Sequence, residues 1–259
     1  MVDEMLDSLM FFLTLGIASY AAIHDLKTTE IPSEAPVLIA ALGSSYALFL
    51  SLTHGDLTHL INAISNAFWL GLIGLLLYKL GQWGDGDAAL LASLGLALPG
   101  NLSWTTLLLN VILVGAAYSL AYTILLGLGN RKARRTLRRE FSRSPFFLLT
   151  FCLTLISTLL LLYSPLLDFR LVTISLGLLL FSLSFFLYRF AKLIERTCLL
   201  KRIPVSALKP GDVLASSREW RGLTREEIER LRTKRRFVVI KEGIRFGPVF
   251  PLALLLLLL

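Results

Sequence analysis

The sequence has 259 residues, of which 55% are hydrophobic, and its mean hydropathy is +0.71. Apolar residues this numerous, gathered in long runs, exclude an ordinary soluble domain and indicate an all-α polytopic membrane protein. The formal net charge is +8, but topology signals and contacts with membrane lipids explain most basic residues, so we expect no nucleic-acid partner. The acidic N-terminus is not typical of a cleavable signal peptide, which makes the first apolar run a retained span. Cys152 and Cys198 lack the spacing of a metal site or a disulfide framework.

About eight apolar runs are predicted to be transmembrane helices. A helix needs about 20 residues to cross a hydrocarbon core of about 30 Å, and six of the runs have roughly this length. The run 88–98 would form only about 16 Å of helix, and the run 246–259 is nearly all leucine after Pro251. We count both as spans. The predicted spans are 5–23, 36–53, 60–80, 88–98, 104–128, 145–163, 169–190 and 246–259.

The segment 131–143 determines the predicted orientation. It carries seven basic residues and one acidic residue, and the positive-inside rule places such a loop in the cytoplasm. Five predicted spans precede it, so the N-terminus lies outside. Of the 26 Lys and Arg residues, this topology leaves only Arg170 on the outer side. We therefore predict a multi-pass protein of the plasma membrane, with the segments 24–35, 81–87 and 191–245 in the cytoplasm.

The polar segment before the last span predicts a small α/β cytoplasmic domain. Residues 208–214 are typical of a turn that leads into a short strand. Thr224 and Glu227 fit a capping box that opens a basic helix through about Arg232, and residues 237–240 favour a strand. The predicted domains are a transmembrane catalytic domain at 1–190, a small cytoplasmic domain at 191–245 and a C-terminal transmembrane helix at 246–259.

Two aspartates, Asp25 and Asp87, each adjoin a long apolar run. With 88–98 counted as a crossing, the predicted topology puts both on the cytoplasmic face. Carboxylates at the edge of a bilayer are costly, so they are candidates for function. Two neighbouring carboxylates can share one proton, so that one acts as general base on water and the other as acid toward a carbonyl.

Each aspartate also has a simpler explanation when it is taken alone. Asp25 could only terminate a span before Ile31-Pro32, and Gly84-Asp85-Gly86-Asp87 could be a polar loop. Asp85 is a less suitable partner for Asp87 than Asp25 is, because side chains two residues apart do not face each other on a helix. The position of both motifs at span ends on one face favours a functional pair.

Two short motifs and the end of the chain form a recognisable combination: Asp25-Leu26-Lys27-Thr28-Thr29-Glu30-Ile31-Pro32, Gly84-Asp85-Gly86-Asp87, and residues 240–251. In this combination the chain resembles the type IV prepilin peptidase family of GxGD aspartyl proteases. It is most similar to the archaeal branch, which includes the preflagellin (archaellin) peptidases. The resemblance implies that Asp25 and Asp87 are the catalytic pair, and that Gly84, Gly86, Ile31 and Pro32 are motif residues.

The resemblance also implies a substrate. Members of this family cut a short basic leader from prepilin-like or preflagellin precursors at the cytoplasmic membrane face, without a metal or organic cofactor. Bacterial members carry a cysteine-rich insert and methylate the new N-terminus; this chain lacks those cysteines, so we expect no methyltransferase activity. Its runs at 145–163 and 169–190 exceed the six-span pattern of the preflagellin enzymes. The acidic residues expected to attract a basic leader are Asp85, Glu30 and Glu34.

A proton- or cation-coupled transporter that uses the two aspartates is the alternative function. Transporter sites are expected near the bilayer midplane, whereas Asp25 and Asp87 are predicted at its edge. A noncatalytic membrane scaffold gives no reason for two acidic motifs on the same face. His54 and His59 lie in an outer loop without further ligands, so we expect no metal there. His24 could tune Asp25, although an interfacial histidine is the simpler interpretation.

Overall fold

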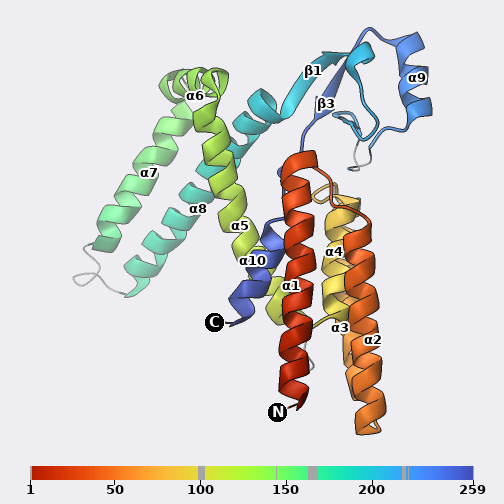
Figure 1. Cartoon of the computed structure of the whole chain (residues 1–259). Helices are drawn as coiled ribbons and strands as arrows, with labels where there is room; N and C mark the ends of the chain where they lie inside the picture. The colour runs from red at the N-terminus through yellow and green to blue at the C-terminus, as the bar shows by residue number, and fades with distance from the viewer. Residues whose placement is uncertain are drawn as a thin grey trace. The chain divides into compact units, whose positions relative to one another are not determined.

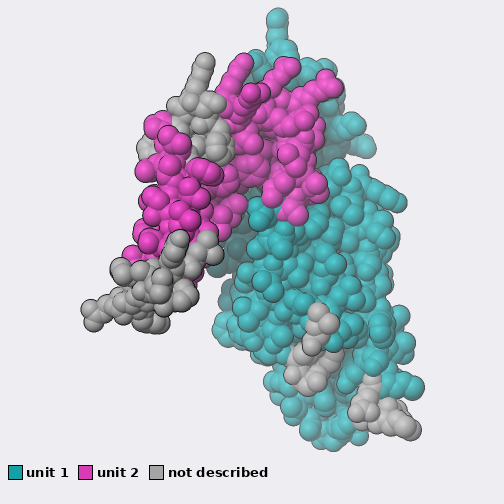
Figure 2. Space-filling model, turned by 90° about the vertical axis from the view of Figure 1, so that its left-hand side faces the viewer, with its two compact units in different colours: residues 1–120, 202–259 teal, residues 121–201 magenta. Residues whose placement is uncertain are grey.

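The computed structural model forms two compact units, coloured teal and magenta in Figure 2. Unit 1 comprises residues 1–120 and 202–259, and unit 2 comprises residues 121–201. The last residues of two predicted spans, 163 and 259, lie outside the described part of the chain. The structure describes residues 2–98, 103–143, 145–162, 169–217, 220 and 222–258.

Unit 1 is built mainly of helices (Figure 1). A segment within a lipid bilayer must satisfy its backbone hydrogen bonds internally, and a helix does so. The chain turns after α2 at Gly55, which has a φ of 69°, a left-handed conformation that is favourable for glycine at a helix end. The helices of unit 1 are α1 (Val2–Thr28), α2 (Glu34–His54), α3 (Thr58–Lys79), α4 (Asp85–Leu96), the first part of α5 (Trp104–Gly129), α9 (Arg225–Lys234) and α10 (Val249–Leu255), which continues as a 3-10 turn at Leu256–Leu258.

The prediction of a mostly helical, multi-pass membrane protein is confirmed, but the count of eight spans is not. Among the described residues, five helices are long and apolar enough to cross a membrane. Helix α4 has 12 residues and is about 18 Å long, against a hydrocarbon core of about 30 Å. The five candidate spans are Met5–Thr28, Glu34–His54, Thr58–Lys79, Trp104–Gly129 and Val172–Leu199, and two shorter apolar helices are Leu148–Leu161 and Val249–Leu258.

Helix α4 packs against α2 and α3, and three of its leucines belong to the core of unit 1. Two glycines allow the close approach. A Cβ at Gly95 would lie 2.6 Å from the backbone nitrogen of Ala67 in α3, and a Cβ at Gly43 in α2 would lie 2.6 Å from the carbonyl carbon of Leu96. The residues of α4 that are almost completely buried are Leu90, Leu91 and Leu94.

The C-terminal end of α1, which carries Asp25, and the N-terminal end of α4, which carries Asp87, lie at the same end of unit 1 (Figure 1). Only α2 and α3 separate the helix that carries Asp25 from the helix that carries Asp87, and two successive crossings return a chain to the side from which it started. This juxtaposition therefore does not require α4 to cross the membrane.

A small sheet with the strand order β1-β3-β2 lies in the polar segment before α10. Strand β2 (Val213–Leu214) pairs antiparallel with β3 (Phe237–Lys241), with Val213 opposite Lys241. The predicted strands near 213 and 237 and the predicted helix after Thr224 are confirmed, whereas β1 (Leu200–Pro204) was not predicted. A small core of its own holds this segment together: Val205, Leu208, Ile228, Val238 and Ile240.

The predicted capping box at Thr224 is also confirmed. The backbone N–H of Thr224 donates to Glu227 Oε2 at 2.9 Å, and the N–H of Glu227 donates to Thr224 Oγ1 at 3.3 Å. These two reciprocal bonds satisfy backbone donors that the first turn of α9 would otherwise leave unpaired.

Unit 2 contains the end of α5, α6 (Arg131–Arg143), α7 (Pro145–Leu162), α8 (Phe169–Ile194) and a π-helical turn at Glu195–Leu199. The segment 131–143 was predicted to be a loop, but it forms helix α6. Its Arg, Lys, Leu and Glu residues are strong helix formers, and Asn130 Oδ1 accepts bonds from the N–H groups of Lys132 (2.9 Å) and Ala133 (3.3 Å) at its start. Helices α7 and α8 pack together.

We expect Gly95→Ala to lower the free energy of unfolding by about 1–3 kcal/mol, because the added methyl group would overlap the backbone of α3. The matched control is Gly16→Ala in α1, where nothing lies within 4 Å of the added group and alanine stabilises a helix by up to about 1 kcal/mol. Unfolding in mixed detergent micelles measures both. Equal stability of the two variants would contradict the close α3–α4 contact.

Candidate active site

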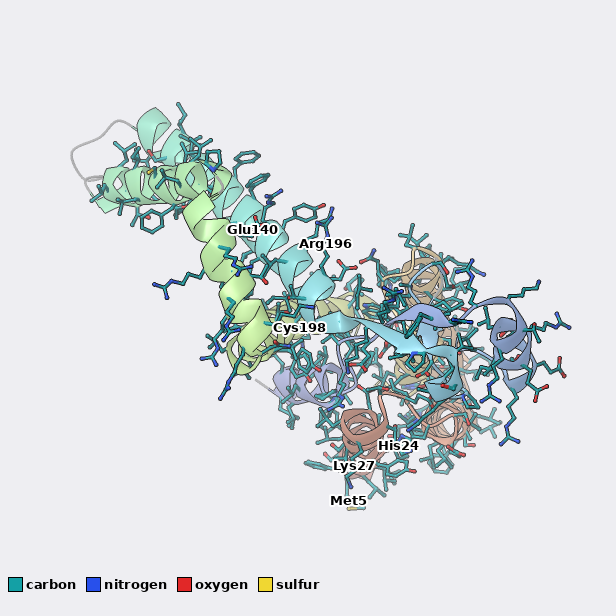
Figure 3. The ribbon with its side chains drawn as sticks, turned by 90° about the horizontal axis from the view of Figure 1, so that it is seen from above. Met5, His24, Lys27, Glu140, Arg196 and Cys198 are labelled. Atoms are coloured by element: carbon teal, nitrogen blue, oxygen red, sulfur yellow. The ribbon has the colours of Figure 1, made fainter. Side chains whose placement is uncertain are left out.

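Two turns of the chain carry Asp25 and Asp87 and form the candidate site. The first turn follows α1. Asp25 is only 5% exposed, and the helix ends three residues later at Thr28. Thr29 then adopts a φ of 65°, and its N–H donates to the Asp25 carbonyl at 2.8 Å. A left-handed conformation is rare for a β-branched residue. His24 helps to hold the turn, because its Nδ1 lies 2.8 Å from the carbonyl oxygen of Glu30; Figure 3 labels His24 on this turn of α1.

The second turn opens α4. Gly84 is the N-cap residue, and its N–H donates to Asp87 Oδ2 at 3.1 Å. A carboxylate in the first turn of a helix is also favoured by the helix dipole. Asp85 is exposed, and its Oδ1 accepts a bond from the N–H of Gly86 at 2.9 Å. The Asp87 carboxylate thus turns back toward the start of its own helix.

The two turns touch at Gly86 and Ile31. A Cβ at Gly86 would lie 2.9 Å from the Cβ of Ile31, so a larger residue at position 86 would push the turns apart. Pro32, the next residue, is buried. The motif residues Gly86, Ile31 and Pro32 therefore lie at the contact between the two turns that carry the aspartates.

The two carboxyl groups are within electrostatic reach of each other. Loss of hydration raises the pKa of Asp87 to about 7; the N–H of Gly84 opposes this rise, and the negative charges of Asp25 and Asp85 add to it. Asp87 is half-buried at the start of α4 and lies outside the five candidate spans. The raised pKa favours the protonated form of Asp87, as in a pair of carboxyl groups that share one proton.

A third segment reaches the site from the end of the chain. The N–H of Gly247 donates to Asp25 Oδ2 at 2.8 Å in a buried position. The guanidinium group of Arg245 acts electrostatically on Asp25. We did not anticipate this donor from the sequence, because a backbone N–H has no signature of its own. The only signal was the family resemblance of residues 240–251.

The sheet segment also contacts the turns that carry the aspartates. Trp220 Nε1 donates to the carbonyl of Gly81 at 2.7 Å, just before the Asp87 turn. On the other turn, the Glu30 carboxylate lies beside Gly211: a Cβ at Gly211 would be 2.5 Å from Glu30 Oε1. The polar segment is therefore packed against both turns of the site.

The predicted acidic residues are separate from the buried pair. Asp85, Glu30 and Glu34 are all exposed, so their charges are available at the surface around the two turns. Within the described ranges, no group of three or more His, Cys, Asp or Glu side chains is arranged to hold a metal ion. The arrangement can thus supply an acid, a base and surrounding negative charge.

Comparison with known families confirms the resemblance to the peptidase family over part of the chain, but not the resemblance to its archaeal branch. The type IV leader peptidase family matches residues 12–120, a segment that contains both aspartates, α2, α3 and α4. This family is one of aspartic peptidases, and its substrates are of the prepilin type. It gives no support to a transporter. No curated protein and no solved structure matches the chain.

We expect Asp85→Asn to lower the pKa of Asp87 below about 7, because the substitution removes one of the two negative charges that raise it. The carboxyl ¹³C resonance of Asp87, followed by NMR as a function of pH, measures the change. Asp56→Asn, in the exposed loop between α2 and α3, should leave this titration unaltered. A wild-type Asp87 that titrates near the ordinary value for an aspartate would contradict the described site.

Proposed function

We propose that this protein is a membrane-embedded aspartic endopeptidase that removes the short basic leader from type IV prepilin-like or preflagellin (archaellin) precursors. The observation that carries the proposal is the contact between the turns that bear Asp25 and Asp87. These two residues are 62 positions apart in the sequence, and both lie inside the segment that matches the type IV leader peptidase family. The repulsion that Asp25 exerts on Asp87 supports their action as a pair.

In the proposed mechanism Asp25 is the general base and Asp87 is the general acid. Asp25 takes a proton from a water molecule whose oxygen bonds to the scissile carbonyl carbon, while Asp87 gives its proton to the carbonyl oxygen. The C–N bond then breaks as the leaving amine takes the proton from Asp25. The carbonyl re-forms and its proton returns to Asp87, so that both groups regain their starting states.

The motif residues have positioning roles in this proposal. Gly84 orients the Asp87 carboxylate through its N–H, and Gly86 allows Ile31 to approach the start of α4. Pro32 is buried beside Ile31 and ends the turn. A larger side chain at Gly86 would separate the two aspartates, and proton sharing requires that they stay close.

We propose that the site faces the cytoplasm and the N-terminus lies outside. The support is the distribution of Lys and Arg, above all the seven basic residues of 131–143. A basic leader would then meet the exposed carboxylates of Asp85, Glu30 and Glu34, which lie in the two turns or at the start of the adjoining helix. Residues 1–190 would form the transmembrane catalytic domain, 191–245 the small cytoplasmic domain and 246–259 the last transmembrane segment.

We assign the protein to the archaeal branch of prepilin and preflagellin peptidases on the resemblance of residues 240–251. The cysteine-rich insert of the methylating bacterial enzymes has no counterpart among the two cysteines of this chain. The proposed activity is therefore peptide-bond hydrolysis without methylation of the new N-terminus.

We expect Asp25→Asn and Asp87→Asn each to lower the rate of leader cleavage by at least about 100-fold, because each removes one partner in proton transfer. The assay incubates the purified protein in lipid with a precursor that has a basic leader and an apolar N-terminal helix, and follows its shortening by mass spectrometry. Asp56→Asn is the matched control and should cleave like the wild type. Undiminished cleavage by either site variant would exclude the proposed pair.

We expect the cleavage rate to fall as the pH is raised through about 7. Above that pH, Asp87 loses the proton that it must donate, because its pKa is about 7. In Asp85→Asn the pKa of Asp87 is lower, so the fall should move to lower pH. Initial rates measured from about pH 5 to about pH 9 test both statements, and a rate that stays constant through pH 7 in the wild type would exclude Asp87 as the acid.

A further inference from the structure

The N–H of Gly247 reaches Asp25 across 222 positions of the sequence. It donates to Asp25 Oδ2 at 2.8 Å, and the bond is buried. Gly247 lies outside the segment 12–120 that matches the peptidase family. A hydrogen bond to an ionised carboxylate is among the stronger ones in proteins, so this contact has a marked influence on the orientation of the carboxylate.

Only a glycine fits at position 247, beside Asp25, unless neighbouring atoms move. A Cβ at Gly247 would lie 2.9 Å from both Cβ and Oδ2 of Asp25, and 3.2 Å from Cα of Ala22. The first two atoms belong to the carboxylate-bearing side chain and the third belongs to the backbone of α1. Any larger residue must therefore displace Asp25 or separate α10 from α1.

Besides its bond to Asp25, the turn that carries Gly247 also contacts the turn that carries Asp87. The ring of Phe246 lies 5.2 Å from the ring of Trp83, measured between centroids, and the ring of Phe250 lies 6.0 Å from that of Trp83. Aromatic pairs at such separations attract each other in tilted and edge-to-face geometries. Phe250 is completely buried, so this contact is part of the core of unit 1.

The two turns share one arrangement, in which an aromatic residue precedes a glycine whose N–H binds an aspartate. Trp83 precedes Gly84, whose N–H holds Asp87, and Phe246 precedes Gly247, whose N–H holds Asp25. Because the two aromatic rings touch, the turn that carries Gly247 is packed against the turn that carries Gly84. The spacing of the carboxylates is therefore coupled to the packing of these rings.

We propose that Gly247 is a positioning residue of the active site, and that Phe246 and Phe250 fix its turn against Trp83 so that Asp25 is held in register with Asp87. This inference rests on the proposed peptidase function for its catalytic meaning, but the contact itself can be tested without catalysis. Preorganised backbone donors of this kind need no reorganisation when the substrate arrives.

Hydrogen–deuterium exchange of the Gly247 amide is the first test, since it does not require a substrate. We expect Asp25→Ala to accelerate this exchange about ten-fold or more, because the acceptor of the N–H is lost. Asp87→Ala is the matched control: it should accelerate exchange at Gly84, whose acceptor it removes, and leave Gly247 as in the wild type. Unchanged exchange of Gly247 in Asp25→Ala would overturn the proposal.

Cleavage kinetics form the second test. We expect Gly247→Ala to lower kcat about 100-fold, as for a misplaced catalytic group, with little change in KM and with an altered pH–rate profile. Gly243→Ala adds the same methyl group four residues earlier, where it would meet the Trp220 ring at an ordinary 3.5 Å, and should retain wild-type kinetics. A wild-type kcat in Gly247→Ala, or a loss that is equal at every pH and matches a loss of folded protein, would overturn the positioning role.

The two tests separate this inference from the proposed function. If the wild type does not cut a precursor but its Gly247 amide responds to Asp25→Ala, the proposed peptidase function fails and the contact stands. If the wild type cleaves and the amide does not respond, the peptidase function stands and the positioning role fails.

Discussion

Two carboxylates brought close together in a partly dehydrated place repel each other and tend to move apart. The structure opposes this tendency with one backbone donor for each group, Gly84 for Asp87 and Gly247 for Asp25. Three distant stretches of the chain must therefore meet at one point. The packing of α4 between α2 and α3, and of α10 against α1, achieves that meeting.

Close packing between helices is important for the stability of this protein, because the hydrophobic effect contributes little to helix association in lipid. Helix α4 is too short to span the hydrocarbon core of a bilayer. Contacts with neighbouring helices fix its position instead. Gly43 and Gly95 let neighbouring backbones approach it, while Leu91 faces the interior. A helix fixed on several sides provides a firm base for a carboxylate in its first turn.

The features predicted correctly from the sequence depend on local signals. The long apolar runs, the capping box at Thr224 and the β-prone stretch near 237 each specify their structure within a few residues. The prediction that Asp25 and Asp87 share a face counted 88–98 as a crossing, whereas the two crossings of α2 and α3 between them are sufficient; their role as a catalytic pair stays a prediction. The donor to Asp25 was not predicted, because Gly247 is distant in sequence and contributes only backbone. Helix α6 was missed because the positive-inside rule concerns charge and not conformation, and an 11-residue run could not by itself decide the number of spans.

The bond between Gly247 and Asp25 has a consequence for the order in which the protein becomes functional. A nascent chain that has emerged only as far as residue 120 already contains both aspartates and the whole segment that matches the peptidase family. It does not yet contain the donor to Asp25, nor the phenylalanine rings that pack on Trp83. Assembly of the site therefore waits for synthesis and docking of α10, so a partly made chain in the membrane has its two acidic residues without the frame that holds them together.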